Sequence, residues 1–155
     1  MRNAKVRTCL WFDQKGEEAA RFYVSLLPGS EIESAFSPDP TKPPLIIDFK
    51  LCATPYQILN GGPQYQHSEA ASIAVLTDDQ AETDRLWEAL TADGGRAVQC
   101  GWLKDKFGLS WQIVPRRLPE LLSDPDAEKA RRIMQAMMQM VKIDVAALEL
   151  AARAA

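Results

Sequence analysis

The stretch GEEAARFYVSLLPGS, residues 16–30, decides the first half of the fold. Its apolar residues recur at helical spacing and would share one face of a helix: Ala19, Phe22, Tyr23, Leu26 and Leu27. Pro28 and Gly29 end this pattern, because neither residue favours a continuing helix. Residues 5–12, just before it, alternate and carry Val, Thr and Trp, which is typical of a strand. A strand followed by an amphipathic helix is therefore expected.

Three more strands are predicted after this helix. Residues 31–36 form the first, and the proline-rich run SPDPTKPP, residues 37–44, is a loop that no helix or central strand could accommodate. LIIDFKLCA and YQILN then read as a hairpin that ends at Gly61, Gly62 and Pro63. The first half is thus a β-α-β-β-β unit.

The same order returns from residue 70 onward. SIAVL is a strand, residues 79–92 form a helix, and RAVQC and LSWQIV give further strands. Several matching positions lie 64 residues apart, namely Thr8 and Ser72, Phe22 and Leu86, Tyr23 and Trp87, and Leu26 and Leu90. This agreement predicts an internal repeat.

The sequence changes character after Pro115. Residues 117–155 lack strand signals and have high helix propensity, so the expected domains are 1–116, with halves at about 1–66 and 67–116, and a helical extension at 117–155. Ile133, Met137 and Met140 form a stripe at helical spacing. Such a stripe favours core or dimer packing, with an adaptable binding surface as the alternative.

The amino-acid composition limits the classes of binding partner and the cellular compartment that can be expected. A formal net charge of -3 and scattered Lys and Arg residues disfavour nucleic-acid binding. No apolar run approaches the roughly 18 residues of a membrane span, and the first strand pattern begins without a signal-peptide core, so a cytoplasmic protein is expected. The three cysteines form no CxxC pair and are expected to be buried free thiols.

Several strings together resemble one known family. They are CLWFD with EEAARFYVSLLPGS, then LNGGP, CGWLKDKFGLSWQIVPRRLPELLSDPD and KIDVAALE. They are similar to the PhnB-like family, also labelled demethylubiquinone methyltransferase-like, of the vicinal oxygen chelate superfamily, which includes glyoxalase and bleomycin resistance proteins. The resemblance implies an α+β fold in which duplicated β-α-β-β-β modules form a curled-sheet cup, and a homodimer.

Enzymes of that superfamily hold a divalent metal in the cup, with one ligand from each of four strands. The resemblance places those positions near Thr8, Gln57, Ser72 and Gln112. Hydroxyls and amides are weak ligands for transition metals, which prefer imidazole, carboxylate or thiolate. We therefore expect no metal and no cofactor. Gln112 cannot move a proton, so the catalytic residues stay unassigned.

The same four residues can instead form a neutral hydrogen-bonding floor for a small molecule. Strand alternation puts Ser110 and Val114 on the face of Gln112, and Trp111 and Ile113 on the other. Trp11, Trp102 and Lys104 are candidate walls of this site. The alternatives are that the polar groups satisfy one another, that the tryptophans only pack, and that residues 104–106 are a charged hairpin tip. Asp48 and Lys50 share another strand face, which is expected to be solvated.

Three classes of function remain. The first is a small-molecule-binding protein without the usual metal site. The second is an enzyme, either a glyoxalase- or dioxygenase-like lyase, with or without a metal, or the methyltransferase of the family label. No glycine-rich loop opens a helix after a strand, however, as a nucleotide-like cofactor would need. The third is an interaction module that uses the C-terminal helices. The sequence leaves open whether any reaction is catalysed.

Overall fold

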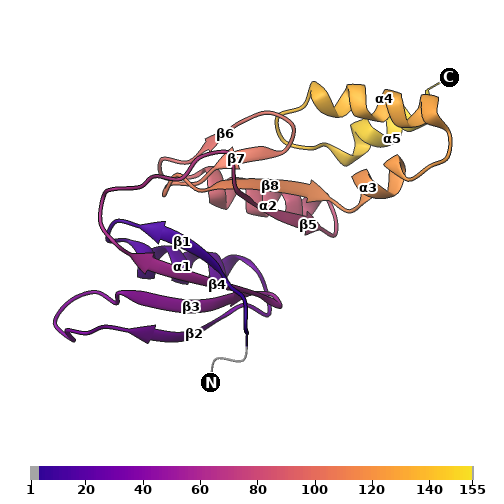
Figure 1. Ribbon diagram of the computed structural model, residues 1–155. Helices are drawn as coiled ribbons and strands as arrows, with labels where there is room; N and C mark the ends of the chain where they lie inside the picture. Colours follow the sequence, from indigo (N-terminus) through magenta and orange to yellow (C-terminus); the bar gives the residue numbers. More distant parts are fainter. Residues whose placement is uncertain (1–3, 155) are drawn as a thin grey trace. The chain divides into compact units, whose positions relative to one another are not determined.

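The computed structural model describes residues 4–154, which fall into two compact units that divide between His67 and Ser68. Within these residues each unit holds one open four-stranded sheet with a long helix beside it, and the second unit adds three helices. The expected α+β class with two modules of one plan is confirmed (Figure 1).

The first unit contains β1 (Thr8–Phe12), α1 (Gly16–Leu26), β2 (Glu31–Phe36), β3 (Ile46–Leu51) and β4 (Thr54–Asn60). Its strands lie in the order β1-β4-β3-β2, with β1 parallel to β4 and the other neighbours antiparallel. The chain reaches the far edge of the sheet through α1 and returns strand by strand, so that β4 inserts beside β1.

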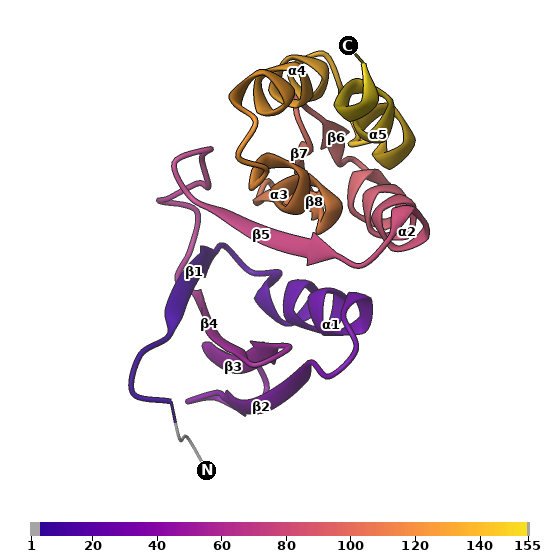
Figure 2. The same ribbon diagram turned by 90° about the vertical axis from the view of Figure 1, so that its right-hand side faces the viewer.

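The second unit repeats this order with β5 (Ser72–Thr77), α2 (Gln80–Thr91), β6 (Arg96–Ala97), β7 (Trp102–Lys104) and β8 (Ser110–Pro115). The strand order is β5-β8-β7-β6, and β5 is parallel to β8. The chain then continues through α3 (Arg117–Leu122), α4 (Ala127–Met138) and α5 (Val145–Arg153), which Figure 2 shows gathered at the C-terminal end.

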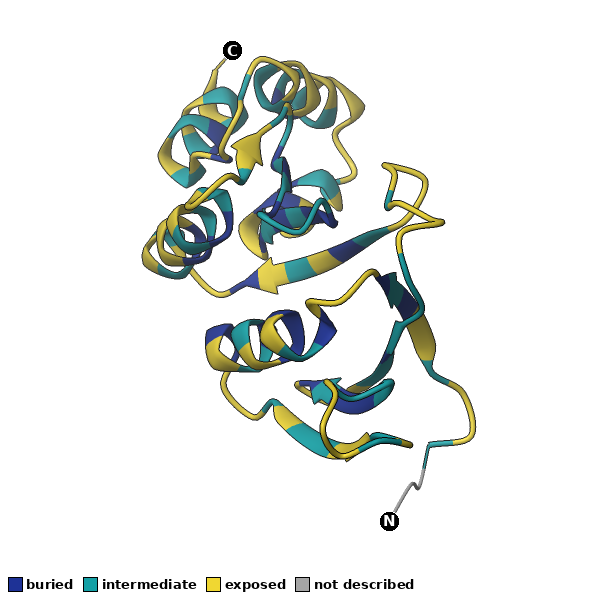
Figure 3. Ribbon diagram, turned by 90° about the vertical axis from the view of Figure 1, so that its left-hand side faces the viewer, coloured by how far each residue is buried: buried dark blue, intermediate teal, exposed yellow. Residues whose placement is uncertain are grey.

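Each long helix covers one face of its own sheet. Tyr23 on α1 and Ile58 on β4 are both 0% exposed, and Leu86 on α2 and Trp111 on β8 are both 1% exposed. Buried positions alternate with more exposed ones along β5, and Figure 3 shows the same contrast across the helices. The opposite face of each sheet is therefore the one available for a site.

The repeat is present, but its expected offset of 64 residues is wrong. Buried helix-side positions match at 63 instead: Leu10 with Ile73, Ala20 with Thr83, Tyr23 with Leu86, and Leu27 with Leu90. Side chains alternate along a strand, so a shift of one residue moves a position to the other face of the sheet. Thr8 and Ser72 consequently do not occupy equivalent faces.

The chain after α4 is built into the second unit. The backbone N–H groups of Cys100 and Gly101 donate to the carbonyls of Met140 and Val141, each at 2.8 Å. The Gln80 amide donates to Ile143 O at 3.1 Å and accepts from Val145 N at 2.8 Å. Five buried side chains form the core beneath these helices: Leu118, Leu121, Ile133, Ile143 and Leu148. Met137 and Met140 of the predicted stripe pack against this core, so the stripe is partly a packing surface.

The expectation of buried thiols is wrong. Cys9 and Cys52 are exposed and Cys100 is partly covered. Cys52 and Cys100 lie in turns with positive φ, and Cys9 is on the sheet face away from α1. None of the helices described in the structure is both long and apolar enough to cross a bilayer.

Candidate functional site

The residues of the second sheet divide cleanly between its two faces. Thr77 points toward α2, because its hydroxyl lies 2.6 Å from that of Thr83. Alternation then places Ser72 on the other face, together with its partner Ser110. Cross-strand pairing adds Trp102, opposite Gln112, and Lys104, opposite Ser110. The structure therefore brings Ser72, Trp102, Lys104 and Gln112 onto one face, and the expected orientation of Gln112 is confirmed.

Hydroxyl and amide groups form the centre of this face. Gln112 Nε2 donates to Ser72 Oγ at 2.9 Å. Ser110 is only 1% exposed, yet its Oγ has no hydrogen-bond partner among the described residues. Buried polar groups nearly always find a partner, so this unpartnered hydroxyl is an unusual feature of the face. We call Ser72, Trp102, Lys104, Ser110 and Gln112 the polar patch.

Charged groups lie at the β7 side of the polar patch. Lys104 Nζ is 2.7 Å from Glu69 Oε1. Arg96 on β6 is the cross-strand neighbour of Lys104 on β7. The Lys104 side chain is 18% exposed, whereas that of Glu69 is 61% exposed. The hydrogen bond from Lys104 is the main cause that lowers the pKa of Glu69 below its ordinary value.

The hairpin tip that follows Lys104 has a structural role, and the prediction of a charged tip is wrong for Asp105. This residue is 3% exposed, and its Oδ1 accepts from Phe107 N at 2.8 Å and Leu109 N at 3.0 Å. Its Oδ2 accepts from Trp111 Nε1 at 2.9 Å. The carboxylate is buried because it satisfies the turn and fixes Trp111 on the α2 side, while Lys104 faces the patch.

An apolar hollow adjoins the polar patch. Its volume is about 270 Å³ and its lining residues are Ala74, Val75, Leu76, Val114, Leu118, Pro119 and Leu122. Ala74 pairs with Gln112, and Leu76 pairs with Val114 one step further along the same face. The face thus passes from hydrogen-bonding groups to hydrocarbon within a few residues. Of its apolar residues, the sequence analysis places only Val114 on this face, because a short apolar strand such as residues 72–77 is otherwise interpreted as core.

The first sheet carries a different set of groups on its face away from α1. Cys9 pairs with Gln57 there, and Gln57 pairs with Asp48 on β3. Gln57 Nε2 donates to Asp48 Oδ1 at 2.9 Å, and Ser34 Oγ lies 3.4 Å from Asp48 Oδ2. Asp48 is 0% exposed, so the expectation that it lies on a solvated face is wrong. The Gln57 amide is engaged by a buried carboxylate rather than open to solvent.

Charge pairs surround this part of the first sheet. Arg7 Nη2 lies 2.6 Å from Glu33 Oε2, and Lys50 Nζ lies 3.2 Å from Glu33 Oε1. Burial acts to raise the pKa of Glu33, but hydrogen bonds from Arg7 and Lys50 outweigh it and the pKa is lowered. Partial burial, and then the charge of Asp48, raise the pKa of the Cys9 thiol. A raised pKa keeps this thiol protonated and weakens it as a nucleophile.

Thr8 and Trp11 belong to the first unit, whereas the polar patch belongs to the second. Thr8 pairs with Tyr56 on the α1 side of the sheet, opposite to the face of Gln57. Trp11 Nε1 donates to Gly62 O at 2.8 Å, and its ring meets Tyr65 edge-on at 4.9 Å between centroids. A Cβ at Gly61 would lie 2.3 Å from the Trp11 ring, so this turn needs glycine. A ligand contact at Thr8 or Trp11 stays a prediction.

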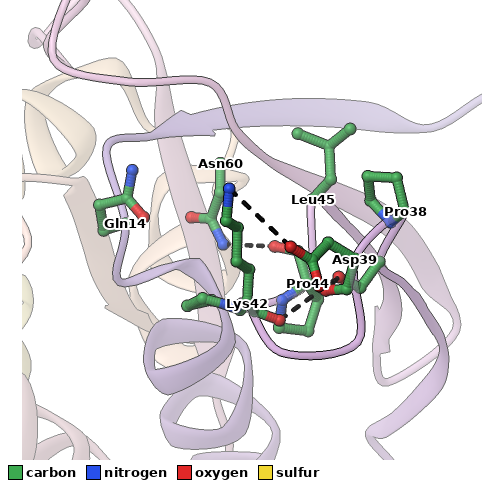
Figure 4. Close-up of a pocket in the computed structure, with 9 residues that line it drawn as sticks. Gln14, Pro38, Asp39, Lys42, Pro44, Leu45 and Asn60 are labelled. Atoms are coloured by element: carbon green, nitrogen blue, oxygen red, sulfur yellow. Dashed lines mark hydrogen bonds and ion pairs between the residues drawn. The ribbon is translucent and has the colours of Figure 1, made fainter.

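A second hollow, of about 210 Å³, lies in the first unit between the proline-rich loop and the start of α1. Figure 4 shows Gln14, Lys42 and Asn60 around it. The Asn60 amide is engaged at both ends, because Nδ2 donates to Pro44 O at 2.8 Å and Oδ1 accepts from Gly16 N at 2.9 Å. Asn60 therefore ties the loop to the helix, and no predicted site residue lies in this hollow.

The donors on these faces do not fit a resident transition metal. Thr8, Gln57, Ser72 and Gln112 offer only hydroxyls and amides, and Thr8 and Gln57 point to opposite faces of one sheet. Residues 4–154 contain no group of three His, Cys, Asp or Glu side chains placed to hold one ion. No step of the function is therefore assigned to a metal.

Comparison with known proteins gives a consistent family and fold. The family model described as 3-demethylubiquinone-9 3-methyltransferase matches residues 4–114. The PhnB protein from Bacillus cereus is 28% identical, with a TM-score of 0.66 over 72% of this chain and 99% of that one. No curated protein matches the sequence.

More distant structures share the fold alone. A protein from Pseudomonas aeruginosa is 23% identical, with a TM-score of 0.60 over 73% of this chain and 98% of that one. The fosfomycin resistance protein FosX from Listeria monocytogenes, solved with Mn(II) and sulfate, is 16% identical, with a TM-score of 0.52 over 79% of this chain and 97% of that one.

Proposed function

The chain belongs to the PhnB-like, 3-demethylubiquinone-9 3-methyltransferase family of the vicinal oxygen chelate superfamily, and from this premise we propose that it binds a small organic molecule on the polar patch of the second unit without a metal ion. The observation that carries the proposal is the buried Ser110 hydroxyl, which lies unpartnered on the face of Ser72 and Gln112. Because Ser110 is 1% exposed, a bound ligand reaches this hydroxyl when the side chains that cover it move aside.

The other groups of the polar patch supply the remaining contacts. The Gln112 amide uses one N–H to donate to Ser72, which leaves its second N–H and its oxygen for a ligand. Trp102 pairs directly with Gln112, so the two side chains start from neighbouring positions on this face. Aromatic walls with a few fixed polar groups are typical of small-molecule sites. Because an amide does not ionise near neutral pH, the proposal is binding rather than acid–base catalysis at Gln112.

Benzamide is a suitable first probe, because it joins an aromatic ring to an uncharged amide. We expect saturable changes in the NMR signals of the Gln112 side-chain amide and a rise in melting temperature with probe concentration. Gln112→Leu should weaken binding about tenfold, since it removes hydrogen bonds to the ligand. Gln135→Leu, an equal change on the exposed side of α4, is the control and should leave affinity unchanged.

Measuring ligand affinity in the presence of the chelator EDTA distinguishes metal-independent binding from binding that needs a metal ion. Affinity should be equal with and without EDTA, and added Mn²⁺ should not change it. Loss of binding in EDTA would overturn metal-independent binding. The absence of any saturable change with benzamide and related aromatic amides at Gln112 would overturn the site itself.

A further inference from the structure

The two residues of the ion pair at the edge of the polar patch differ in how far they are exposed to solvent. Lys104 projects from β7 and is 18% exposed, whereas Glu69 belongs to the turn just before β5 and is 61% exposed. The cation is thus fixed by the sheet, and the carboxylate reaches it from a solvent-exposed turn. Their separation of 2.7 Å is that of a charge-assisted hydrogen bond.

The charges around this pair favour an anion. Arg96 lies opposite Lys104 on the neighbouring strand, so two cations share this part of the face with the carboxylate of Glu69. Asp105 is turned away and engaged by Trp111 and the hairpin backbone. Without Glu69, the patch would present two uncompensated positive charges beside the Ser110 hydroxyl.

The apolar hollow lies at the opposite end of the same face. Lys104 pairs with Ser110, and the hollow begins near Ala74 and Val114. Ser110 and Val114 are four residues apart on β8, a distance of about 13 Å at 3.3 Å per residue. A molecule that spans this distance meets positive charge at one end, amide and hydroxyl groups in the middle, and hydrocarbon at the other end.

We propose that the ligand is an organic carboxylate with an apolar body, and that Glu69 is an internal competitor that occupies the place of the ligand's carboxylate on Lys104. This inference rests on the proposed binding at the polar patch and adds the class of ligand. Binding exchanges one carboxylate for another, so Lys104 is never left without a counter-charge. The turn that carries Glu69 moves aside when the ligand enters.

A matched pair of probes tests this exchange, namely 4-phenylbutanoate and its uncharged amide, 4-phenylbutanamide. Glu69→Gln should strengthen binding of the carboxylate about fivefold, which is the scale of losing one partly exposed ion pair. The amide should change less than twofold. Lys104→Met should weaken the carboxylate about tenfold and not the amide.

Glu128→Gln is the control, because it removes an exposed carboxylate that pairs with Arg131 at 2.6 Å on α4. It should leave both affinities unchanged. If both probes bind at the Gln112 signals but Glu69→Gln alters neither affinity, internal competition is overturned while binding at the patch stands. If neither probe gives a saturable change in any variant, both proposals are overturned.

Discussion

The cores of the two units differ in residue size at one repeated pair of positions. In the first unit the helix position carries Tyr23 and the strand position carries Ile58, both 0% exposed. In the second unit the helix position carries Leu86, and the strand carries Trp111. The buried volume is shared differently while the strand order is the same. Equal architecture therefore does not require equal residues at equal positions.

The outer faces of the two sheets differ more than their cores do. The first carries the buried Asp48 beside Gln57 and the Arg7–Glu33 pair. The second carries an orphan hydroxyl and an ion pair whose carboxylate is exposed. Buried atoms of Arg7 and Glu33 also lack a hydrogen-bond partner within residues 4–154, although the two side chains form an ion pair at 2.6 Å. The proposed binding at the second sheet therefore rests on the position of its polar groups beside the apolar hollow.

Removing the large residue of the second core should have the largest effect. Trp111→Ala should lower the free energy of unfolding by about 3–5 kcal/mol, because it creates a cavity. It also leaves Asp105 Oδ2 without its donor at 2.9 Å. Chemical denaturation followed by circular dichroism measures the loss. Trp87→Ala, on the partly exposed side of α2, is the control, and an equal loss there would contradict the comparison.

The ion pair between Arg7 and Glu33 on the first sheet should make the stability of the protein depend on pH. The pKa of Glu33 is lowered in the folded protein from its ordinary value of 4.5. Its stabilisation is therefore complete above pH 4.5 and is lost as pH falls through the lower, folded pKa. Glu33→Gln should lower stability at pH 7 by about 1–3 kcal/mol, since it leaves Arg7 without its charged partner.

The same substitution should flatten the fall in stability below pH 4.5, which denaturant titration at several pH values measures. Glu69→Gln is the corresponding change in the second unit. It should cost less at neutral pH, because Glu69 is 61% exposed. A larger cost for Glu69→Gln than for Glu33→Gln would reverse the assignment of structural and binding roles.

The smallest expected effect concerns Cys9. Burial and then the charge of Asp48 raise the pKa of its thiol, so Asp48→Asn removes the second cause and should lower that pKa. More thiolate is then present at pH 8, and alkylation by iodoacetamide should speed up about twofold to threefold. Mass spectrometry of individual peptides compares Cys9 with Cys52 as the internal reference. An unchanged ratio would show that Asp48 does not act on this thiol.

Much of the fold follows from sequence because its signals are local. The helix at residues 16–26 and the prolines of residues 37–44 need no distant information to be interpreted. The repeat is also visible, but its offset was missed by one residue. Helical spacing tolerates such a shift because neighbouring apolar positions can exchange roles, whereas strand alternation does not. Thr8 and Gln57, which the family resemblance puts in one site, lie on opposite faces of the first sheet.

The chemistry of the site could be predicted only in part. The face of Gln112 follows from alternation alone, and the pairing with Trp102 and Lys104 agrees with it. Burial of Asp48 and Asp105 could not be foreseen, because a charged residue in a strand or turn normally reads as solvated. Their partners, Gln57 and Trp111, lie nine and six positions away, and only cross-strand pairing brings them close.

The backbone link between residues 100–101 and 140–141 bears on how the chain folds as it is made. A ribosome delivers the segment up to residue 67 early, and that unit can acquire its own hydrogen bonds at once. The N–H groups of Cys100 and Gly101 must instead stay hydrated until some forty further residues have been translated. The backbone hydrogen bonds of the second unit are therefore completed later in synthesis than those of the first unit.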